Sequence, residues 1–272
     1  PSIEVMQKYG VSAAVTQANA IGVTSLTQEA GTKHGLSLAI GSAEVALREM
    51  TDAYATLSNQ GMRNEPLLVQ NITDKFDKNI FTAETKSEQG ISQAGAFLIS
   101  DILSDNDARA PRLGSSLNVT GHTVAVKTGT NDDELDAWTI GYTPSVTVGI
   151  WVGNADNSPM SGGGAAMAGP IWQGTMTDIL GSGKDEKFSV PSSVTEKGTC
   201  YSNHGIATNS ETYGTYQEFY LASALPSKTC SPYEPKPVEV CNLKSKKIEE
   251  IDEKNFDSSK YSKNVSDCKT ET

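Results

Sequence analysis

Apolar residues in the first part of the chain recur at helical intervals. Residues 12–21 predict one helix, which Gly22 would end, and residues 92–103 predict another. A third helix is predicted between them, because Ser42 can act as its N-cap and Gly61 can adopt a left-handed turn after its end. The apolar positions of this third helix are Met50, Ala53, Tyr54 and Leu57.

From His122 onward the pattern changes to a period of two. Val124 and Val126 alternate with polar or small residues, which predicts a strand with two different faces. Residues 138–142 and 146–152 predict two further strands, and a Thr-Pro-Ser turn joins them. We therefore expect three consecutive antiparallel strands.

A closing helix is predicted after the glycine-rich segment 161–164. Its apolar positions are Met167, Ile171, Trp172, Met176 and Ile179. Pro170 must lie in its first turn or kink it. Helices followed by a meander and a closing helix indicate an α+β domain. Since three strands and one covering helix are marginal alone, we expect upstream sequence to cover the sheet's apolar residues. These residues are Val124, Val126, Ile140 and Ile150.

Composition separates a tail from this body. Hydrophobic residues make up 37% of the chain, and they become scarce after about Leu180. We place the boundary between residues 1–182 and a C-terminal extension, residues 183–272. All the cysteines lie in the extension, at Cys200, Cys230, Cys241 and Cys268. An even number of cysteines in a core-poor region favours disulfides and an oxidising compartment, and their spacing lacks the C-x-x-C pairs of zinc sites.

We predict that Cys200 pairs with Cys230 and that Cys241 pairs with Cys268. Prolines between Cys230 and Cys241 separate two similar stretches, and local closure costs the least entropy. Each crosslink would contribute roughly 3 kcal/mol by the chain-entropy relation.

The net charge is −11 and the pI is about 4.8, which argues against nucleic acid as a partner. The basic run 244–247 is followed directly by acidic residues, so we interpret it as a solvated helix face. No stretch approaches the length of a membrane span. Because the chain begins at Pro1, we expect it to be a fragment, with any targeting segment upstream.

Candidate chemistry lies at the end of the first predicted strand, in Lys127-Thr128-Gly129-Thr130. A lysine there offers a fixed cation for a carboxylate, and Gly129 lets a ligand backbone lie against the strand. The hydroxyls of Thr128 and Thr130 can donate to the same carboxylate, and the Thr130 N–H can stabilise an oxyanion. Alone, this tripeptide is a weak signal.

The surrounding segments make the signal specific. They are Lys127-Thr128-Gly129-Thr130-Asn131, Asp136-Ala137-Trp138, Gly141-Tyr142-Thr143-Pro144 and Trp151-Val152-Gly153-Asn154. Together with upstream residues 37–42 and 53–61 and downstream residues 168–172, they resemble bifunctional (class A) penicillin-binding proteins. The resemblance covers about residues 1–180.

This resemblance implies the β-lactamase/transpeptidase-like fold, N-terminally truncated here, and a serine-type D,D-transpeptidase that needs no cofactor and no metal. It implies Lys127 and Thr130 as catalytic residues, and Thr128, Gly129, Thr130 and Asn131 as substrate-binding residues. The implied partners are peptidoglycan stem peptides, β-lactam antibiotics, and an upstream glycosyltransferase domain and membrane anchor. The implied location is the extracytoplasmic face of the bacterial membrane.

Two alternatives stay open. A D,D-carboxypeptidase or β-lactamase would use water as the acceptor of the acyl group. A non-catalytic wall-binding module would use the disulfide-bearing tail as its working part.

The family that the chain resembles also needs a Ser-x-x-Lys motif, which contains the nucleophile, and a Ser-x-Asn motif. Segments 266–269, 104–106 and 116–118 match by letter but lie at the wrong places in the chain. Residues 1–5 resemble the segment just after the family's Ser-x-Asn, so we expect the nucleophile upstream and this fragment alone to be inactive. Val126 stands where the family usually has a glycine.

Other polar residues offer weaker candidates. The histidines His34, His122 and His204 have no triad or metal spacing. The acidic run at Asp132, Asp133, Glu134 and Asp136 is interpreted as a solvated turn, and the glycine-rich segment as a flexible rim loop.

Overall fold

The computed structural model describes residues 1–131, 133–201, 203–208, 215–230, 237–252 and 255–268. The chain forms two compact units, Pro1–Val194 and Thr195–Thr272. The division falls later than the predicted boundary at 182, because the segment after the closing helix returns to the first unit. There Asp185 accepts a hydrogen bond from the Thr123 N–H at 2.7 Å, and the ring of Phe188 packs edge-on against Tyr142.

The first unit begins with helices. They are α1 (Ser2–Tyr9), α2 (Val11–Ile21), α3 (Gln28–His34), the 3-10 helix η1 (Gly35–Ile40) and α4 (Leu47–Ser58). Helix α2 confirms the predicted helix, and it ends at Gly22, whose φ of 129° suits glycine. Val15 of α2 packs with Val23, Leu26 and Ala53 in a small core.

Helix α4 begins later than predicted. Ala46 is extended at its N-cap and provides no side-chain cap, whereas the Ser42 hydroxyl bonds the Ser37 hydroxyl at 2.9 Å. Ser42 thus lies in the irregular segment before the helix, so its prediction as the N-cap is wrong. Gly61 does adopt a positive φ, 82°, and its N–H donates to the Thr56 carbonyl.

Two short antiparallel pairs separate α4 from the next helices. Strand β1 (Met62–Asn64) pairs with β4 (Ser87–Gln89), and β2 (Asn71–Thr73) pairs with β3 (Asn79–Thr82). Helix α5 (Gln93–Ser104) follows, as predicted, with the Ser92 hydroxyl accepting from the Gly95 N–H. Helix α6 (Asn106–Leu113) comes next.

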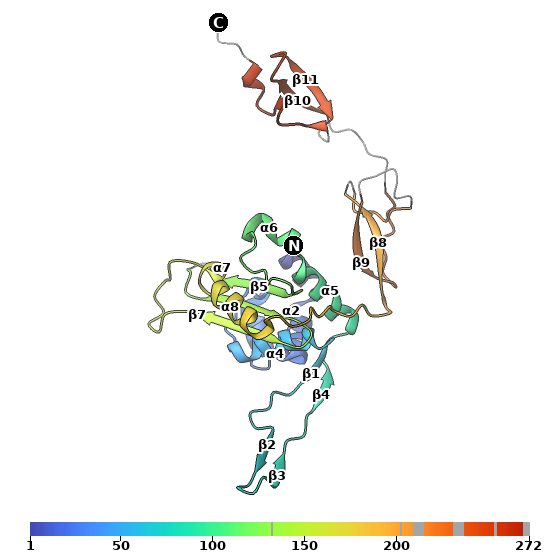
Figure 1. The fold of residues 1–272 in the computed structure, drawn as a ribbon. Coiled ribbons are helices and arrows are strands. Elements are labelled where there is room, and N and C mark those ends of the chain that lie inside the picture. The colour runs from blue at the N-terminus through green and yellow to red at the C-terminus, as the bar shows by residue number, and fades with distance from the viewer. Residues whose placement is uncertain (132, 202, 209–214, 231–236, 253–254, 269–272) are drawn as a thin grey trace. The chain divides into compact units, whose positions relative to one another are not determined.

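The predicted meander is present. Strands β5 (Ala125–Thr130), β6 (Ala137–Tyr142) and β7 (Thr147–Val152) form a three-stranded sheet in that order, with antiparallel pairing throughout (Figure 1). Helices α7 (Gly164–Met167) and α8 (Gly169–Leu180) close the unit, and Pro170 lies in the first turn of α8.

Both faces of this sheet are covered. On one face Val124 and Val126 pack with Trp172 and Met176 of α8. On the other face the buried Tyr142 hydroxyl bonds the Ser100 hydroxyl of α5 at 2.9 Å. Val124, Val126 and Ile140 are therefore buried and Ile150 is partly buried, so the expectation that these residues need upstream sequence to cover them is wrong. Helices of the chain itself supply the cover.

The second unit is built from small sheets. Strand β8 (Val194–Cys200) pairs with β9 (Thr215–Leu221). Strand β10 (Pro237–Asn242) lies between β11 (Ile248–Asp252) and β12 (Tyr261–Ser262), and a 3-10 turn, η3 (Val265–Cys268), follows.

Two disulfides close these sheets with the predicted pairing. Cys200 is joined to Cys230 and Cys241 to Cys268, with Cα–Cα distances of 5.8 and 5.3 Å. Cys200 and Cys241 are fully buried. The crosslinks thus occupy interior positions that apolar side chains would otherwise fill.

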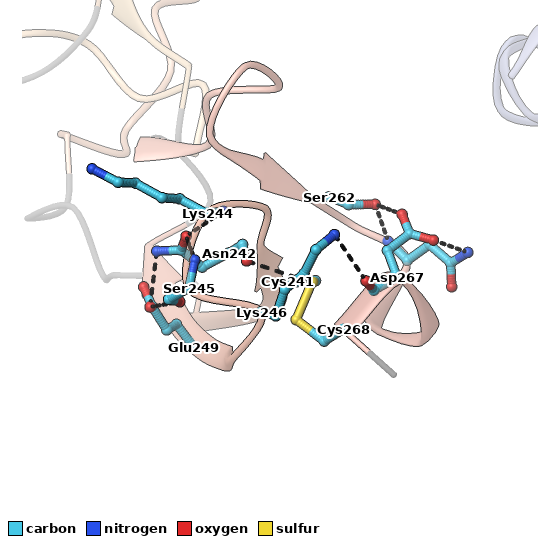
Figure 2. The surroundings of a disulfide bond; sticks show 10 residues. Cys241, Asn242, Lys244, Ser245, Lys246, Glu249, Ser262, Asp267 and Cys268 are labelled. Atoms are coloured by element: carbon cyan, nitrogen blue, oxygen red, sulfur yellow. Dashed lines mark hydrogen bonds between the residues drawn. A yellow bond between two sulfur atoms is a disulfide. The ribbon is translucent and has the colours of Figure 1, made fainter. Parts of the chain in front are cut away.

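The surroundings of the second disulfide show why the basic run is not helical (Figure 2). The Asn242 side-chain oxygen accepts from the backbone N–H groups of Lys244 and Ser245, each at 3.0 Å. This Asx-type bonding forms a turn before β11, so the interpretation of residues 244–247 as a helix face is wrong.

Among the helices in the described ranges, none is long and apolar enough to cross a bilayer.

Candidate active site

Lys127 lies on an edge strand of the meander. Strand β5 pairs with β6 on one side, and Lys127 stands opposite Ile140 in that ladder. The residues before it are buried, whereas Lys127 is exposed. Its Nζ donates to the carbonyl oxygen of the next residue, Thr128, at 2.6 Å. The ammonium group is thus held beside the strand backbone, where an extended ligand would lie.

Thr128 projects from the opposite face of the strand. In the ladder it stands opposite Thr139, on the face that α7 and α8 cover, while Lys127 belongs to the other face. The structure therefore does not bring these two side chains to one face. A shared role for them remains an expectation from the family resemblance.

Gly129 is not required by the packing of the sheet around it. It stands opposite Trp138, and a Cβ built on it would lie 3.4 Å from the Trp138 Cβ, an ordinary contact distance. A larger residue would instead cover the backbone beside Lys127. The glycine thus leaves the strand surface open for a ligand.

Thr130 is tied to the glycine-rich loop. Its Oγ1 accepts a hydrogen bond from the Gly164 N–H at 2.8 Å. A Cβ on Gly163 would lie 2.3 Å from that Oγ1, and one on Gly164 would lie 2.4 Å from the Trp138 carbonyl oxygen. The loop therefore needs both glycines for its close approach to the strand end. Thr130 keeps its own hydroxyl proton, which can still donate to a ligand.

The hydrogen bond between this loop and Thr130 was not predicted from the sequence, because the loop is interpreted there as a flexible rim. Consecutive glycines before an apolar helical pattern are the signal that could have indicated a close backbone approach.

Asn131 holds the turn that follows β5. Its side-chain oxygen accepts from the N–H groups of Leu135 and Asp136, at 2.7 and 3.2 Å, and its amide donates to the Asp136 carboxylate. Asp136 also accepts from the indole N–H of Trp151 at 2.8 Å. Asn131 thus shapes the turn, and its contact with a substrate stays a prediction. Within the described ranges, no acidic, histidine or cysteine group is arranged to hold a metal.

The hydroxyls of Ser104, at the end of α5, and of Ser116, in the turn after α6, form local hydrogen bonds. The Ser104 hydroxyl donates to the Asp101 carbonyl at 3.1 Å, and the Ser116 hydroxyl donates to the Leu113 carbonyl at 2.8 Å. Cys268, in the tail segment 266–269, is part of a disulfide. Local structure thus explains the positions of the Ser104 and Ser116 hydroxyls, and Lys269 lies outside the described residues.

The histidines His34, His122 and His204 do not lie together at one site. His122 Nε2 lies 3.2 Å from the Gly181 carbonyl oxygen in the first unit. His204 Nδ1 lies 3.2 Å from the Tyr216 hydroxyl in the second unit. His34 occupies the last position of α3.

The fold and the strand motif together define a class of protein. An antiparallel meander covered by helices on both faces, with Lys-Thr-Gly on its edge strand, is the arrangement of serine penicillin-recognising enzymes. The family described as the penicillin binding protein transpeptidase domain matches residues 4–177, and the chain belongs to this family.

Curated relatives agree with this family. Penicillin-binding protein 2D of Bacillus subtilis is 28% identical over 243 residues, which are 83% of this chain and 33% of the relative. Penicillin-binding protein 1A of Mycobacterium tuberculosis is 30% identical over 174 residues, 58% of this chain and 21% of the relative. The chain thus spans about a third or less of the length of these relatives.

Solved structures show the same fold. The alignment with penicillin-binding protein 1A of Haemophilus influenzae covers 84% of this chain and 39% of the solved chain, with a TM-score of 0.70 and 23% identity. The alignment with penicillin-binding protein PonA1 of Mycobacterium tuberculosis covers 70% of this chain and 55% of the solved chain, with a TM-score of 0.58 and 26% identity. The domain thus resembles the transpeptidase part of class A penicillin-binding proteins.

Proposed function

We propose that this chain is the substrate-binding part of a peptidoglycan D,D-transpeptidase. The observation that carries the proposal is Lys127, exposed on an edge strand beside the open backbone of Gly129. A cation at that place can bind the terminal carboxylate of a peptide that lies along the strand as an added strand. The family match supports this function over a hydrolase or a wall-binding module.

The proposed chemistry is acyl transfer in two steps. A serine oxygen attacks the carbonyl carbon between the last two residues of a stem peptide ending in D-Ala-D-Ala, the C–N bond breaks, and the leaving amine takes the proton. An amine of a neighbouring stem peptide then attacks the ester carbonyl, the C–O bond to the serine breaks, and a proton of the amine passes to the departing serine oxygen. A β-lactam would acylate the same serine.

The residues of this chain would hold the reacting peptide. Lys127 and the hydroxyls of Thr128 and Thr130 would bind its carboxylate, and the part given to Thr128 rests on the family motif, because its side chain lies on the face opposite to Lys127. The Thr130 N–H would donate to the oxyanion, and Gly129 and Asn131 would line the strand surface. The bond from the Gly164 N–H fixes the Thr130 hydroxyl before the ligand arrives, which lowers the cost of ordering it.

The nucleophile and its base are proposed to lie upstream in a longer protein. Oxyanion donors and a cation can bind a ligand but cannot replace the nucleophile, so this chain alone is proposed to be inactive. The same longer protein would carry the glycosyltransferase domain and the membrane anchor. The two disulfides support a location outside the cytoplasm.

Acylation of the longer protein by a fluorescent penicillin tests the proposal. Lys127→Ala should slow acylation by about 100-fold or more, since a fixed charge at a developing anion contributes several kcal/mol to the rate. The matched control is Lys86→Ala, an exposed lysine that pairs with Glu65 at 3.7 Å. Equal acylation rates for Lys127→Ala and Lys86→Ala would remove Lys127 from the active site.

A further inference from the structure

The β8–β9 sheet carries two tyrosines whose rings are in tilted contact, one of them exposed and the other partly buried. Tyr201 follows β8 and Tyr216 lies on β9, and their ring centroids are 4.9 Å apart with a 40° tilt. Tyr201 remains 67% exposed. A tyrosine joins an apolar ring face to a polar hydroxyl, so an exposed tyrosine can contact an apolar surface and form a hydrogen bond at the same time. We call Tyr201, Tyr216 and His204 the tyrosine platform.

Polar groups border the platform. His204 Nδ1 lies 3.2 Å from the Tyr216 hydroxyl, and the Tyr220 hydroxyl is hydrogen-bonded to the Thr199 hydroxyl at 2.8 Å. Burial raises the pKa of Tyr216, and the nearby Tyr220, Glu218 and Tyr201 raise it further. Phenols, an imidazole and the Glu218 carboxylate thus lie near the two rings.

The disulfide holds this platform in place. Cys200 is bonded to Cys230, the His204 N–H donates to the Cys200 carbonyl, and the Cys200 N–H donates to the Gly205 carbonyl. The short turn that carries His204 is therefore tied to β8 at both ends. Aromatic contacts held in advance in this way lose little conformational entropy when a ligand binds.

We infer that the tyrosine platform binds a saccharide, namely the glycan strand of peptidoglycan. This inference rests on the proposed function, which places the protein at that polymer. The apolar C–H face of a pyranose ring can lie on an exposed tyrosine ring, while hydroxyl and N-acetyl groups bond to the imidazole and the phenols.

Charge favours an uncharged sugar over a polyanion. The charged side chain that raises the Tyr216 pKa is the carboxylate of Glu218, and the whole chain carries a net charge of −11. A phosphate-rich polymer would be repelled by both, whereas hydroxyl groups of a glycan can donate to a carboxylate.

Titration of the whole chain with tetra-N-acetylchitotetraose tests the inference, with affinities measured by NMR. We expect wild-type protein to bind with a Kd of about 1 mM, the range of a few solvent-exposed contacts. Tyr201→Ala should weaken binding about 10-fold, the loss expected when the sugar loses its contact with one aromatic ring. His204→Ala, which keeps both rings, should weaken it by a smaller factor.

Tyr9→Ala is the matched control, because Tyr9 is 56% exposed in the first unit. It should bind the sugar like wild type. The inference is overturned if wild-type protein does not bind the sugar, if Tyr201→Ala binds as tightly as Tyr9→Ala, or if inorganic polyphosphate displaces the sugar.

Penicillin acylation of the longer protein separates this inference from the proposed function. Tyr201→Ala should be acylated at the wild-type rate, and a slowed rate would show that the platform supports the transpeptidase unit instead of binding sugar. If this chain binds the sugar and Tyr201→Ala weakens that binding, but the wild-type longer protein takes up no penicillin, the proposed function fails and the saccharide site stands.

Discussion

The two units of this chain are stabilised in different ways. The first buries large side chains, including Trp172, Tyr142 and Met176, between its sheet and helices. In the described part of the second unit, the fully buried hydrophobic residues are Val240 and two disulfide cysteines, Cys200 and Cys241. Burial of apolar area thus stabilises the part that carries Lys127, and crosslinks compensate for a thin core in the tail. The units should therefore respond to different perturbations.

The largest effect is expected from removal of a core side chain in the first unit. Trp172 is fully buried, and its indole N–H donates to the Val148 carbonyl at 3.1 Å. Trp172→Ala should lower the free energy of unfolding by about 3–5 kcal/mol through lost burial and a cavity. Urea denaturation followed by circular dichroism measures it.

Ile171→Ala is the control on the same helix, because Ile171 is 51% exposed. It should cost about 1 kcal/mol or less. Similar costs for Trp172→Ala and Ile171→Ala would contradict the packed interface between α8 and the sheet.

Removal of the first disulfide should affect the second unit alone. The crosslink closes a sequence separation of 30 residues, so Cys200→Ser with Cys230→Ser should destabilise that sheet by about 3–4 kcal/mol. Hydrogen exchange read by mass spectrometry should show lost protection in β8 and β9. Lost protection in β5 to β7 as well would contradict the independence of the two units.

A smaller effect is expected at Glu49 of α4. Burial disfavours its charge, but hydrogen bonds from Ser25 and Thr24 outweigh that effect, and its pKa is held below the ordinary value of 4.5. Glu49→Gln should cost about 1.5–3 kcal/mol at neutral pH, because it weakens hydrogen bonds to a buried charge. The exposed Glu44→Gln is its control and should be nearly neutral.

The pH dependence of that effect has a defined sign. A carboxyl whose pKa is lower in the folded state stabilises the protein fully above its unfolded pKa, and this contribution is lost as the pH falls through the folded value. The difference in stability between wild type and Glu49→Gln should therefore shrink below about pH 4.5, the ordinary value. A difference that grows on acidification would contradict the hydrogen bonding described for Glu49.

Much of the fold could be predicted from local patterns. The meander followed from period-two alternation, α2 and α5 from their apolar spacing and end residues, and the disulfides from loop lengths. The start of α4 was missed because Ser42 bonds Ser37 instead of capping. The cover of Val124 and Val126 was missed because tertiary packing by α8 is invisible to local periodicity.

The candidate site could be predicted only in part. Lys127 and Gly129 were predicted because a strand end and a family motif coincide; the structure places both on the edge strand β5, and their role stays a prediction. The hydrogen bond from the Gly164 N–H to the Thr130 hydroxyl was not predicted, because the two residues are far apart in the sequence. The hydrogen bond from the Leu135 N–H to the Asn131 side chain was not predicted either, because it depends on backbone geometry that composition does not specify.

The most direct test of the account asks whether this chain contains an acylatable serine. We propose that it supplies the binding strand while the nucleophile lies upstream, so intact-mass spectrometry after incubation with penicillin should show no covalent adduct. The longer protein, treated in the same way, should gain one penicillin per chain and serves as the positive control. A stoichiometric adduct on this chain, mapped to Ser104, Ser116 or Ser266, would contradict the account.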